Sequence, residues 1–262
     1  MLEFHSINLL YSLSGFLIGG LVGFTGVGGG SLMTPLLVLG FGILPATAVG
    51  TDLLYATITK MSGTLVHGLN GTVEWRIVRR LATGSIPATI LTILALKYLG
   101  VKQHGASGLI TSVLGFALIL TAVTILSRKW LLAHLAHYVE GLPDRQTLYL
   151  TIALGAFLGV LVSISSVGAG AIGVTALVLL YPQLPVARTV GSDIAHAMPL
   201  TFVAGIGHLF LGTVDWNLLI WLLIGSLPGI AIGSYLAARV PDRLLRPVLA
   251  STLALTGARL IL

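Results

Sequence analysis

A lysine stands inside an otherwise apolar stretch of the sequence. Lys60 lies in residues 49–69, which also contain Asp52. An ammonium group within a bilayer costs at least ~2.5 kcal/mol, so such a lysine usually faces a polar cavity or a charged partner. A buried cation can bind an anion; the alternatives are a lysine that extends toward lipid headgroups or one neutralised by Asp52. We therefore predict that Lys60 binds a small anionic substrate.

Two glycine-rich segments give a second anion signal. Residues 26–31 read GVGGGS and residues 166–171 read SVGAGA. Glycine at this density breaks a helix, and the apolar segments that follow are too short to cross a bilayer upright. Each segment therefore predicts a re-entrant hairpin or a pair of half-helices, with free amides at the start of a short helix facing an anion. The alternative is a close glycine contact between two full helices. The predicted substrate-binding backbone comprises Gly28, Gly29, Gly30, Ser31, Gly168, Ala169, Gly170 and Ala171.

Two carboxylates and one imidazole are candidates for proton coupling. Asp52 and Asp193 each follow a Gly-Thr or Gly-Ser pair near an expected helix start, and His196 comes shortly after Asp193. Intramembrane acids and histidines often relay protons in transporters. The alternatives are helix capping for the aspartates and a structural role for the histidine.

The sequence carries no signature of an enzyme. It lacks a His-Glu-x-x-His run and a Walker motif, and residues 26–30 follow an apolar helix rather than the strand of a dinucleotide fold. Cysteine is absent, which excludes thiolate metal sites. The basic residues lie in short loops and are not interleaved with aromatics, so nucleic acid is not an expected partner. We predict no catalytic residues, no cofactor and no metal.

Composition places the chain in a membrane. Of 262 residues 56% are hydrophobic and 8% are charged, against roughly a quarter charged in soluble domains. Apolar runs lie at residues 7–27, 81–96, 108–126, 148–164 and 218–238, each close to the ~20 residues that span ~30 Å of hydrocarbon. The first run lacks a basic segment and a cleavage site, so we expect it to be retained. The fold class expected is an all-α integral membrane protein, a polytopic helical bundle.

The chain is internally duplicated. Adding 141 to residues of the first half reproduces their types in the second: Gly50, Asp52, His67, Gly71, Trp75, Gly84, Ser85 and Pro87 match Gly191, Asp193, His208, Gly212, Trp216, Gly225, Ser226 and Pro228. An offset of 140 applies upstream. The predicted first repeat covers residues 1–126, with a hairpin at 7–42 and helices at 46–69, 76–97 and 106–126. A cytoplasmic linker covers 127–147. The second repeat covers 148–262, with a hairpin at 148–181 and helices at 187–211, 217–238 and 243–262.

The number of spans in each repeat predicts opposite orientations. One hairpin and three full spans make an odd number of crossings, so the second repeat is inverted relative to the first. With the N-terminus in the periplasm, the cytoplasmic side holds Arg76, Arg79, Arg80, Arg128, Lys129, Arg145, Arg188, Arg239, Arg243 and Arg246. The opposite side holds Lys97, Lys102 and Arg259. This distribution satisfies the positive-inside rule.

The glycines at 19–20, GVGGGS at 26–31, PATAVGT at 45–51 and a weaker second copy of this pattern resemble the sulfite exporter TauE/SafE family of membrane permeases. The resemblance covers nearly the whole chain. It implies a duplicated helical bundle that moves sulfite, sulfonates or related sulfur oxyanions across the bacterial inner membrane. Ser166 and Ala169 replace two glycines of the first copy, which weakens the expectation that both hairpins bind substrate equally.

These observations together predict a secondary membrane transporter that exports a small sulfur oxyanion, sulfite first, by alternating access between the hairpin tips. Coupling to protons would use Asp52, Asp193 or His196. The expected partners are the anion and the lipid bilayer. The sequence leaves undecided whether the chain forms a homo-oligomer. A passive anion channel and a non-transporting membrane scaffold are the alternative functions.

Overall fold

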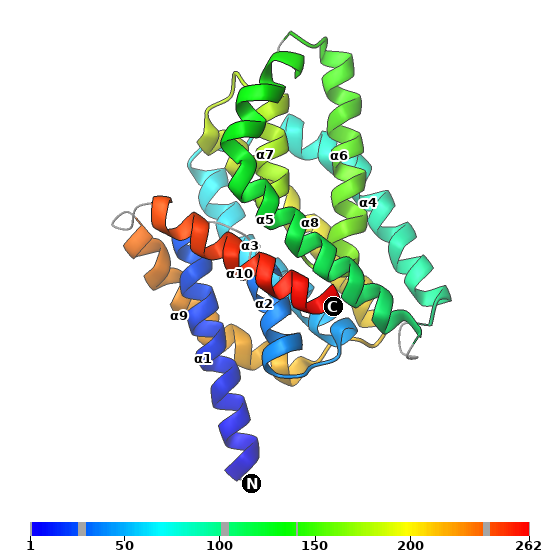
Figure 1. Cartoon of the computed structure of the whole chain (residues 1–262), viewed down its shortest axis with the longest axis vertical. Helices are drawn as coiled ribbons and strands as arrows, with labels where there is room; N and C mark the ends of the chain where they lie inside the picture. The colour runs from blue at the N-terminus through cyan, green and yellow to red at the C-terminus, as the bar shows by residue number, and fades with distance from the viewer. Residues whose placement is uncertain (1, 26–29, 101–104, 140, 238–241, 262) are drawn as a thin grey trace.

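The computed structural model describes residues 2–25, 30–100, 105–139, 141–237 and 242–261. These residues form helices joined by turns, with no strand among them (Figure 1). In the first half the helices are α1 (Leu2–Thr25), α2 (Gly30–Pro35) with its π-helical continuation η1 (Leu36–Gly40), α3 (Pro45–Leu69), α4 (Trp75–Tyr98) and α5 (Gly105–Val139). In the second half they are α6 (Asp144–Ser165), α7 (Ala171–Leu180), α8 (Val186–Phe210), α9 (Trp216–Ala237) and α10 (Asp242–Ile261). The predicted all-α class is confirmed.

Several helices are suited to a bilayer. Within the described residues, four are long and apolar enough to cross it: Trp75–Tyr98, Gly108–Leu135, Asp144–Ser165 and Trp216–Gly233. The helices α3 and α8 have 25 residues each but carry the charged and hydroxyl side chains singled out above. Protein surrounds them on several sides, and a helix shielded from lipid does not need an apolar surface.

The two hairpins contribute one long and one short helix each. The second arm α7 has 10 residues, whereas the first arms α1 and α6 have 24 and 22 and are longer than half-helices. The Tyr181 hydroxyl at the end of α7 lies 2.8 Å from the Thr151 hydroxyl on α6, so this hairpin returns toward the end where it began. In the first hairpin the Tyr11 and Phe41 rings meet at 4.9 Å.

The turn between α6 and α7 needs its glycines. Gly168 and Gly170 both have φ of 119°, a region that side chains with a Cβ rarely adopt. Ser166 is left-handed as well, with φ of 59°. In the first hairpin Gly30 begins α2, whereas Gly28 and Gly29 lie outside the described residues.

Contacts between the two halves occur in matched pairs. The Glu74 amide donates to the Ser192 hydroxyl (2.8 Å), and the Asp215 amide donates to the Thr51 hydroxyl (3.0 Å). Thr51 and Ser192 are equivalent positions, as are Glu74 and Asp215. Thr51 lies near the start of α3 and bonds to Asp215 in the segment after α8. Ser192 lies near the start of α8 and bonds to Glu74 in the segment after α3. The start of each of these helices therefore lies beside the end of the other.

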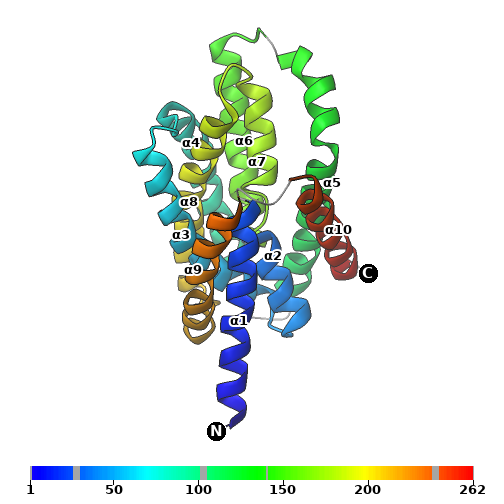
Figure 2. The same cartoon turned by 90° about the vertical axis from the view of Figure 1, so that its left-hand side faces the viewer.

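Glycines allow equivalent close contacts between outer helices of the two halves. A Cβ on Gly84 of α4 would overlap the Ile152 carbonyl of α6, and one on the equivalent Gly225 of α9 would overlap the Ser12 carbonyl of α1. Figure 2 shows α5 and α10 together at one edge, α3, α4, α8 and α9 at the other, and the hairpins between them.

The predicted linker is largely helical, because α5 continues past Leu126 to Val139. The sequence from Ser127 to Val139 contains neither glycine nor proline, so nothing in it ends a helix. Gly141, with φ of 83°, and Pro143 come later and precede α6.

Candidate functional site

Helices α3 and α8 pack against each other at the centre of the molecule. The hydroxyls of Thr57 and Thr201 lie 3.1 Å apart there, and both side chains are buried. Thr201 is the equivalent of Lys60, which stands one turn along α3 from Thr57. Lys60 therefore lies close to the midpoint between the two halves.

Lys60 is partly buried and close to the predicted acids. Its ammonium group acts electrostatically on the carboxylates of Asp52 and Asp193, and on the imidazole of His196. This neighbourhood argues against a lysine that extends into lipid headgroups. With both acids ionised, the cluster of one cation and two anions has one net negative charge. An external anion is then repelled unless a carboxylate is first neutralised.

Asp52 is fully buried on α3. Its Oδ2 accepts a hydrogen bond from the Thr34 hydroxyl of α2 (2.6 Å), while its Oδ1 has no partner. The Ser166 side chain from the second hairpin also approaches this carboxylate without a hydrogen bond. Because α3 begins at Pro45, Asp52 lies too far into the helix to cap it, and helix capping is excluded for this residue.

Asp193 is equally buried on α8, with 1% of its surface exposed. The backbone amide of Gly170 at the start of α7 is directed at its carboxylate. Its Oδ1 has no hydrogen-bond partner and lies against Gly173, where a Cβ would overlap it. Helix α8 begins at Val186, so Asp193 is not a helix cap either.

His196 is buried one turn beyond Asp193. Its Nε2 lies 2.8 Å from the Ser85 hydroxyl of α4, and its Nδ1 has no partner. The equivalent pair in the other half is Tyr55 of α3, which lies beside Ser226 of α9. The His196 imidazole therefore connects the second half to the first, at a position where the first half has the phenol of Tyr55.

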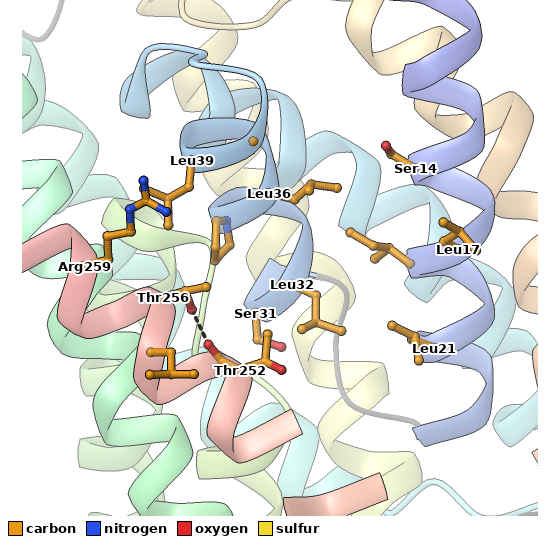
Figure 3. A pocket seen from close by; sticks show the side chains of 14 residues that line it. Ser14, Leu17, Leu21, Ser31, Leu32, Leu36, Leu39, Thr252, Thr256 and Arg259 are labelled. Atoms are coloured by element: carbon orange, nitrogen blue, oxygen red, sulfur yellow. Dashed lines mark hydrogen bonds between the residues drawn. The ribbon is translucent and has the colours of Figure 1, made fainter. Parts of the chain in front are cut away.

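The predicted backbone cradles are placed differently in the two hairpins. Gly168, Ala169, Gly170 and Ala171 run together into the start of α7, where Gly170 faces Asp193. Ser31, 5% exposed, lies instead on the wall of a cavity of about 570 Å³ bounded by α1, α2, η1 and α10 (Figure 3).

The cavity beside Ser31 is mainly apolar. Figure 3 shows Leu17 and Leu21 of α1 and Leu32 of α2 along it, with Ser31 facing the segment of α10 that carries Thr252. The guanidinium of Arg259 lines the same cavity near Leu39. The structure therefore brings together Lys60, Asp52, Asp193 and His196 with the start of α7, and places Ser31 on the wall of this apolar cavity.

Several polar residues of the centre were not predicted from sequence. Thr34 and Tyr55 have no motif of their own, and Ser166 stood out only as part of the second glycine-rich segment, so the contacts of these residues reveal their place in the centre. Ser85 did carry a signal, because it recurs as Ser226 in the duplicated pattern. A hydroxyl kept in both copies inside an apolar helix is a candidate polar contact between them.

The long apolar helices, the broken hairpins and the charged centre define a polytopic α-helical membrane protein. The chain belongs to the sulfite exporter TauE/SafE family, whose sequence profile matches residues 11–260.

Relatives match over nearly their full length. The chain is 39% identical over 250 residues to the probable membrane transporter protein YjnA of Bacillus subtilis, which covers 95% of this chain and 98% of the relative. It is 28% identical over 255 residues to the probable membrane transporter protein YdhB of the same organism, covering 97% and 100%. The probable membrane transporter protein MJ0441 of Methanocaldococcus jannaschii is 25% identical over 281 residues, covering 100% and 98%. No solved structure gives a significant match.

Proposed function

We propose that this protein is a secondary transporter that exports a small sulfur oxyanion, sulfite first among the candidates, across the bacterial inner membrane. The observation that carries the proposal is the partly buried Lys60, whose ammonium group interacts electrostatically with the buried carboxylates of Asp52 on α3 and Asp193 on α8. The family's description supplies the class of anion, and the relatives' names supply transport. The same chemistry gives no support to an enzyme.

We further propose that the two halves are inverted repeats that alternate access to this centre. The matched bonds of Thr51 with Asp215 and of Ser192 with Glu74 support an arrangement with a pseudo-twofold axis. Arg76 and Arg80 lie at the same end of the molecule as Arg188, which pairs with Glu74. A cytoplasmic location for this end satisfies the positive-inside rule and leaves the N-terminus in the periplasm.

In this proposal Lys60 and the amides at the start of α7 bind the anion. The backbone from Gly28 to Ser31 stays a predicted counterpart in the first hairpin, with Gly28 and Gly29 outside the described residues. Asp52, Asp193 and His196 are the candidate proton-coupling groups, because they are buried and each has an atom without a hydrogen-bond partner.

The test is sulfite efflux from proteoliposomes containing the wild-type protein, Lys60→Met or Lys97→Met. Methionine keeps most of the side-chain volume and removes the charge. Because a hydrogen bond to a charged group is worth about 1.5–3 kcal/mol, Lys60→Met is expected to lower flux by roughly tenfold or more. Lys97 is exposed at the end of α4, so Lys97→Met should match the wild type.

A charge-exchange variant makes the test specific to position. Lys60→Thr combined with Thr201→Lys moves the ammonium to the equivalent site on α8, and partial recovery of flux over Lys60→Thr is expected. Flux that rises linearly with sulfite concentration without saturation would indicate a channel. Absence of sulfite, thiosulfate and sulfate flux through the folded wild type would contradict the proposal and leave a scaffold.

A further inference from the structure

A carboxyl group of the protein itself, that of Asp193, already lies at the start of α7. Helix α7 has 10 residues, and the first amides of a helix lack partners within it and carry partial positive charge. The Asp193 carboxylate is 1% exposed, and its unpartnered Oδ1 lies against Gly173 in the first turn of α7, within reach of the Gly170 amide. The carboxylate therefore occupies the place that a substrate oxyanion would need.

The charges around Asp193 make this occupancy dependent on its ionisation. From α3, the Lys60 ammonium acts on Asp193, and the His67 imidazole lies beside Gly191. On α8 itself, His196 stands one turn away. Helix α7 has no ionisable side chain.

The arginines Arg76 and Arg80 at the start of α4 are engaged with an acid on α6. Arg80 on α4 pairs with Asp144 on α6, at 2.8 Å. Among the described residues, Lys60 is the basic side chain whose charge acts on Asp193, so an ionised Asp193 and a substrate anion would share it.

We propose that the substrate anion and the ionised Asp193 carboxylate compete for the same backbone amides and for Lys60, so that each anion binds together with one proton. This inference rests on the proposed function and adds the direction of coupling: anion and proton cross in the same direction. The cluster containing ionised Asp52 and Asp193 has a net negative charge. Protonation of one carboxylate makes it neutral and removes the repulsion.

Each step conserves charge and protons. A proton from water on the entry side binds the Asp193 carboxylate and forms a neutral carboxylic acid, and the Gly170 amide is then available to the anion. On the exit side the anion leaves, the carboxylic acid releases its proton to water, and the carboxylate returns to the amide. A dianion that moves with one proton carries one net negative charge outward, so the inside-negative membrane potential still favours export.

Asp52 differs in its partners. The Thr34 hydroxyl of α2 donates to its Oδ2 and the Ser166 side chain approaches it, so its partners among the described residues are hydroxyl side chains. Hydroxyl groups can also accept a hydrogen bond from a carboxylic acid, whereas a backbone amide can only donate. The competition is therefore assigned to Asp193.

The first experiment separates exchange from accumulation in proteoliposomes. Thiosulfate is the probe, because it stays ionised near neutral pH, and the membrane potential is held at zero. With the exterior one pH unit more acidic, the wild type should accumulate thiosulfate about tenfold, as one proton per anion requires. Asp193→Asn, which resembles the protonated acid, should keep exchange but show an accumulation ratio near one.

Asp215→Asn is the matched control. The Asp215 Oδ1 accepts a hydrogen bond from the Leu218 amide at the start of α9, and asparagine caps a helix about equally well. This variant should accumulate thiosulfate like the wild type. Accumulation by Asp193→Asn equal to that of the wild type would overturn the inference while leaving transport itself intact.

A second measurement needs no variant. Calorimetric titration of the wild-type protein with sulfite, in two buffers of different ionisation enthalpy, gives the protons taken up per anion after correction for sulfite's own ionisation. One proton per bound anion is expected, and a value near zero would overturn the coupling even if Asp193→Asn failed to fold. Absence of both binding and exchange by the wild type would refute the proposed function instead.

Discussion

The two ends of the molecule are built on equivalent positions with different chemistry. At the first, which we call the Arg80 end, both Asp144 oxygens accept hydrogen bonds from the Arg80 Nη2 at 2.8 Å. The Arg80 Nη1 donates to the Tyr181 hydroxyl at 3.2 Å, and that hydroxyl meets Thr151 at 2.8 Å. Arg76 also pairs with Asp144. Ion pairs therefore join α4 to α6 at this end, and hydrogen bonds to the Tyr181 hydroxyl attach the end of α7 to them.

The opposite end, which we call the Trp221 end, contains no ion pair among its described residues. Trp221 stands where the repeat has Arg80, and its indole donates to Asn217 at 3.1 Å. Asn217 in turn donates to Asn8 of α1 at 3.2 Å. Tyr11 and Phe41, which replace Thr151 and Tyr181, make an edge-to-face ring contact.

The turns that follow α3 and α8 keep matched contacts in spite of these differences. His67 Nδ1 lies 2.8 Å from the Thr72 hydroxyl, and the equivalent His208 Nδ1 lies 2.9 Å from Thr213. A transporter that alternates access must open its two ends in turn. For the alternating access proposed above, a shared frame with unequal ends would allow the equilibrium between the two open forms to be set without a change in the frame. We therefore expect frame variants to act equally in both halves and end variants to act unequally.

The largest effects are expected for the glycines of the shared frame. Gly84→Ala and Gly225→Ala each place a methyl group against a carbonyl of the facing helix, and overpacking of this kind costs about 1–3 kcal/mol. Thermal unfolding in detergent should show both variants destabilised to a similar degree. Gly68→Ala, with open space around it, is the control and should not be destabilised. A large effect of one glycine without the other would break the equivalence of the two packing contacts.

The next largest effect is expected at the Arg80 end. The Arg80 side chain is 9% exposed, whereas that of Asp144 is 60% exposed. Arg80→Gln removes the charged hydrogen bonds to Asp144 and the bond to Tyr181, so thermal unfolding should occur several degrees lower. The loss should shrink as salt is raised, because the exposed side of the pair is screened. Arg79→Gln is the matched control, since Arg79 is exposed and its Nε reaches only the Trp75 carbonyl, at 3.4 Å. An equal shift for both arginine variants would remove the distinction between the two ends.

Sequence predicted the frame better than the site. The apolar runs and the recurrence of Gly84 as Gly225 were enough for an all-α membrane bundle, because bilayer thickness and close backbone packing constrain residue types strongly. Lys60 and the two aspartates were predictable as charges inside apolar helices. Their partners were not, since Thr34 and Ser166 reach Asp52 through tertiary contacts that no local pattern encodes. The unequal ends were missed for the same reason: Arg80 appeared in the sequence only as a topological charge.

The smallest effect should come from making the Arg80 end resemble the other. Tyr181→Phe introduces the residue found at the equivalent Phe41 and deletes one hydroxyl, which contacts Thr151 and Arg80. Neutral hydrogen bonds contribute about 0.5–1.5 kcal/mol each, so a modest destabilisation is expected. Because the Arg80–Asp144 pair remains, the salt dependence of unfolding should stay close to that of the wild type, in contrast to Arg80→Gln. Thermal unfolding of Tyr11→Phe at the Trp221 end gives the comparison. Tyr11 contributes its ring to the contact with Phe41, and phenylalanine retains that ring. If Tyr181→Phe abolished the salt dependence, the hydroxyl rather than the ion pair would hold α7 at this end. The difference between the Arg80 end and the Trp221 end would then depend on the Tyr181 hydroxyl alone.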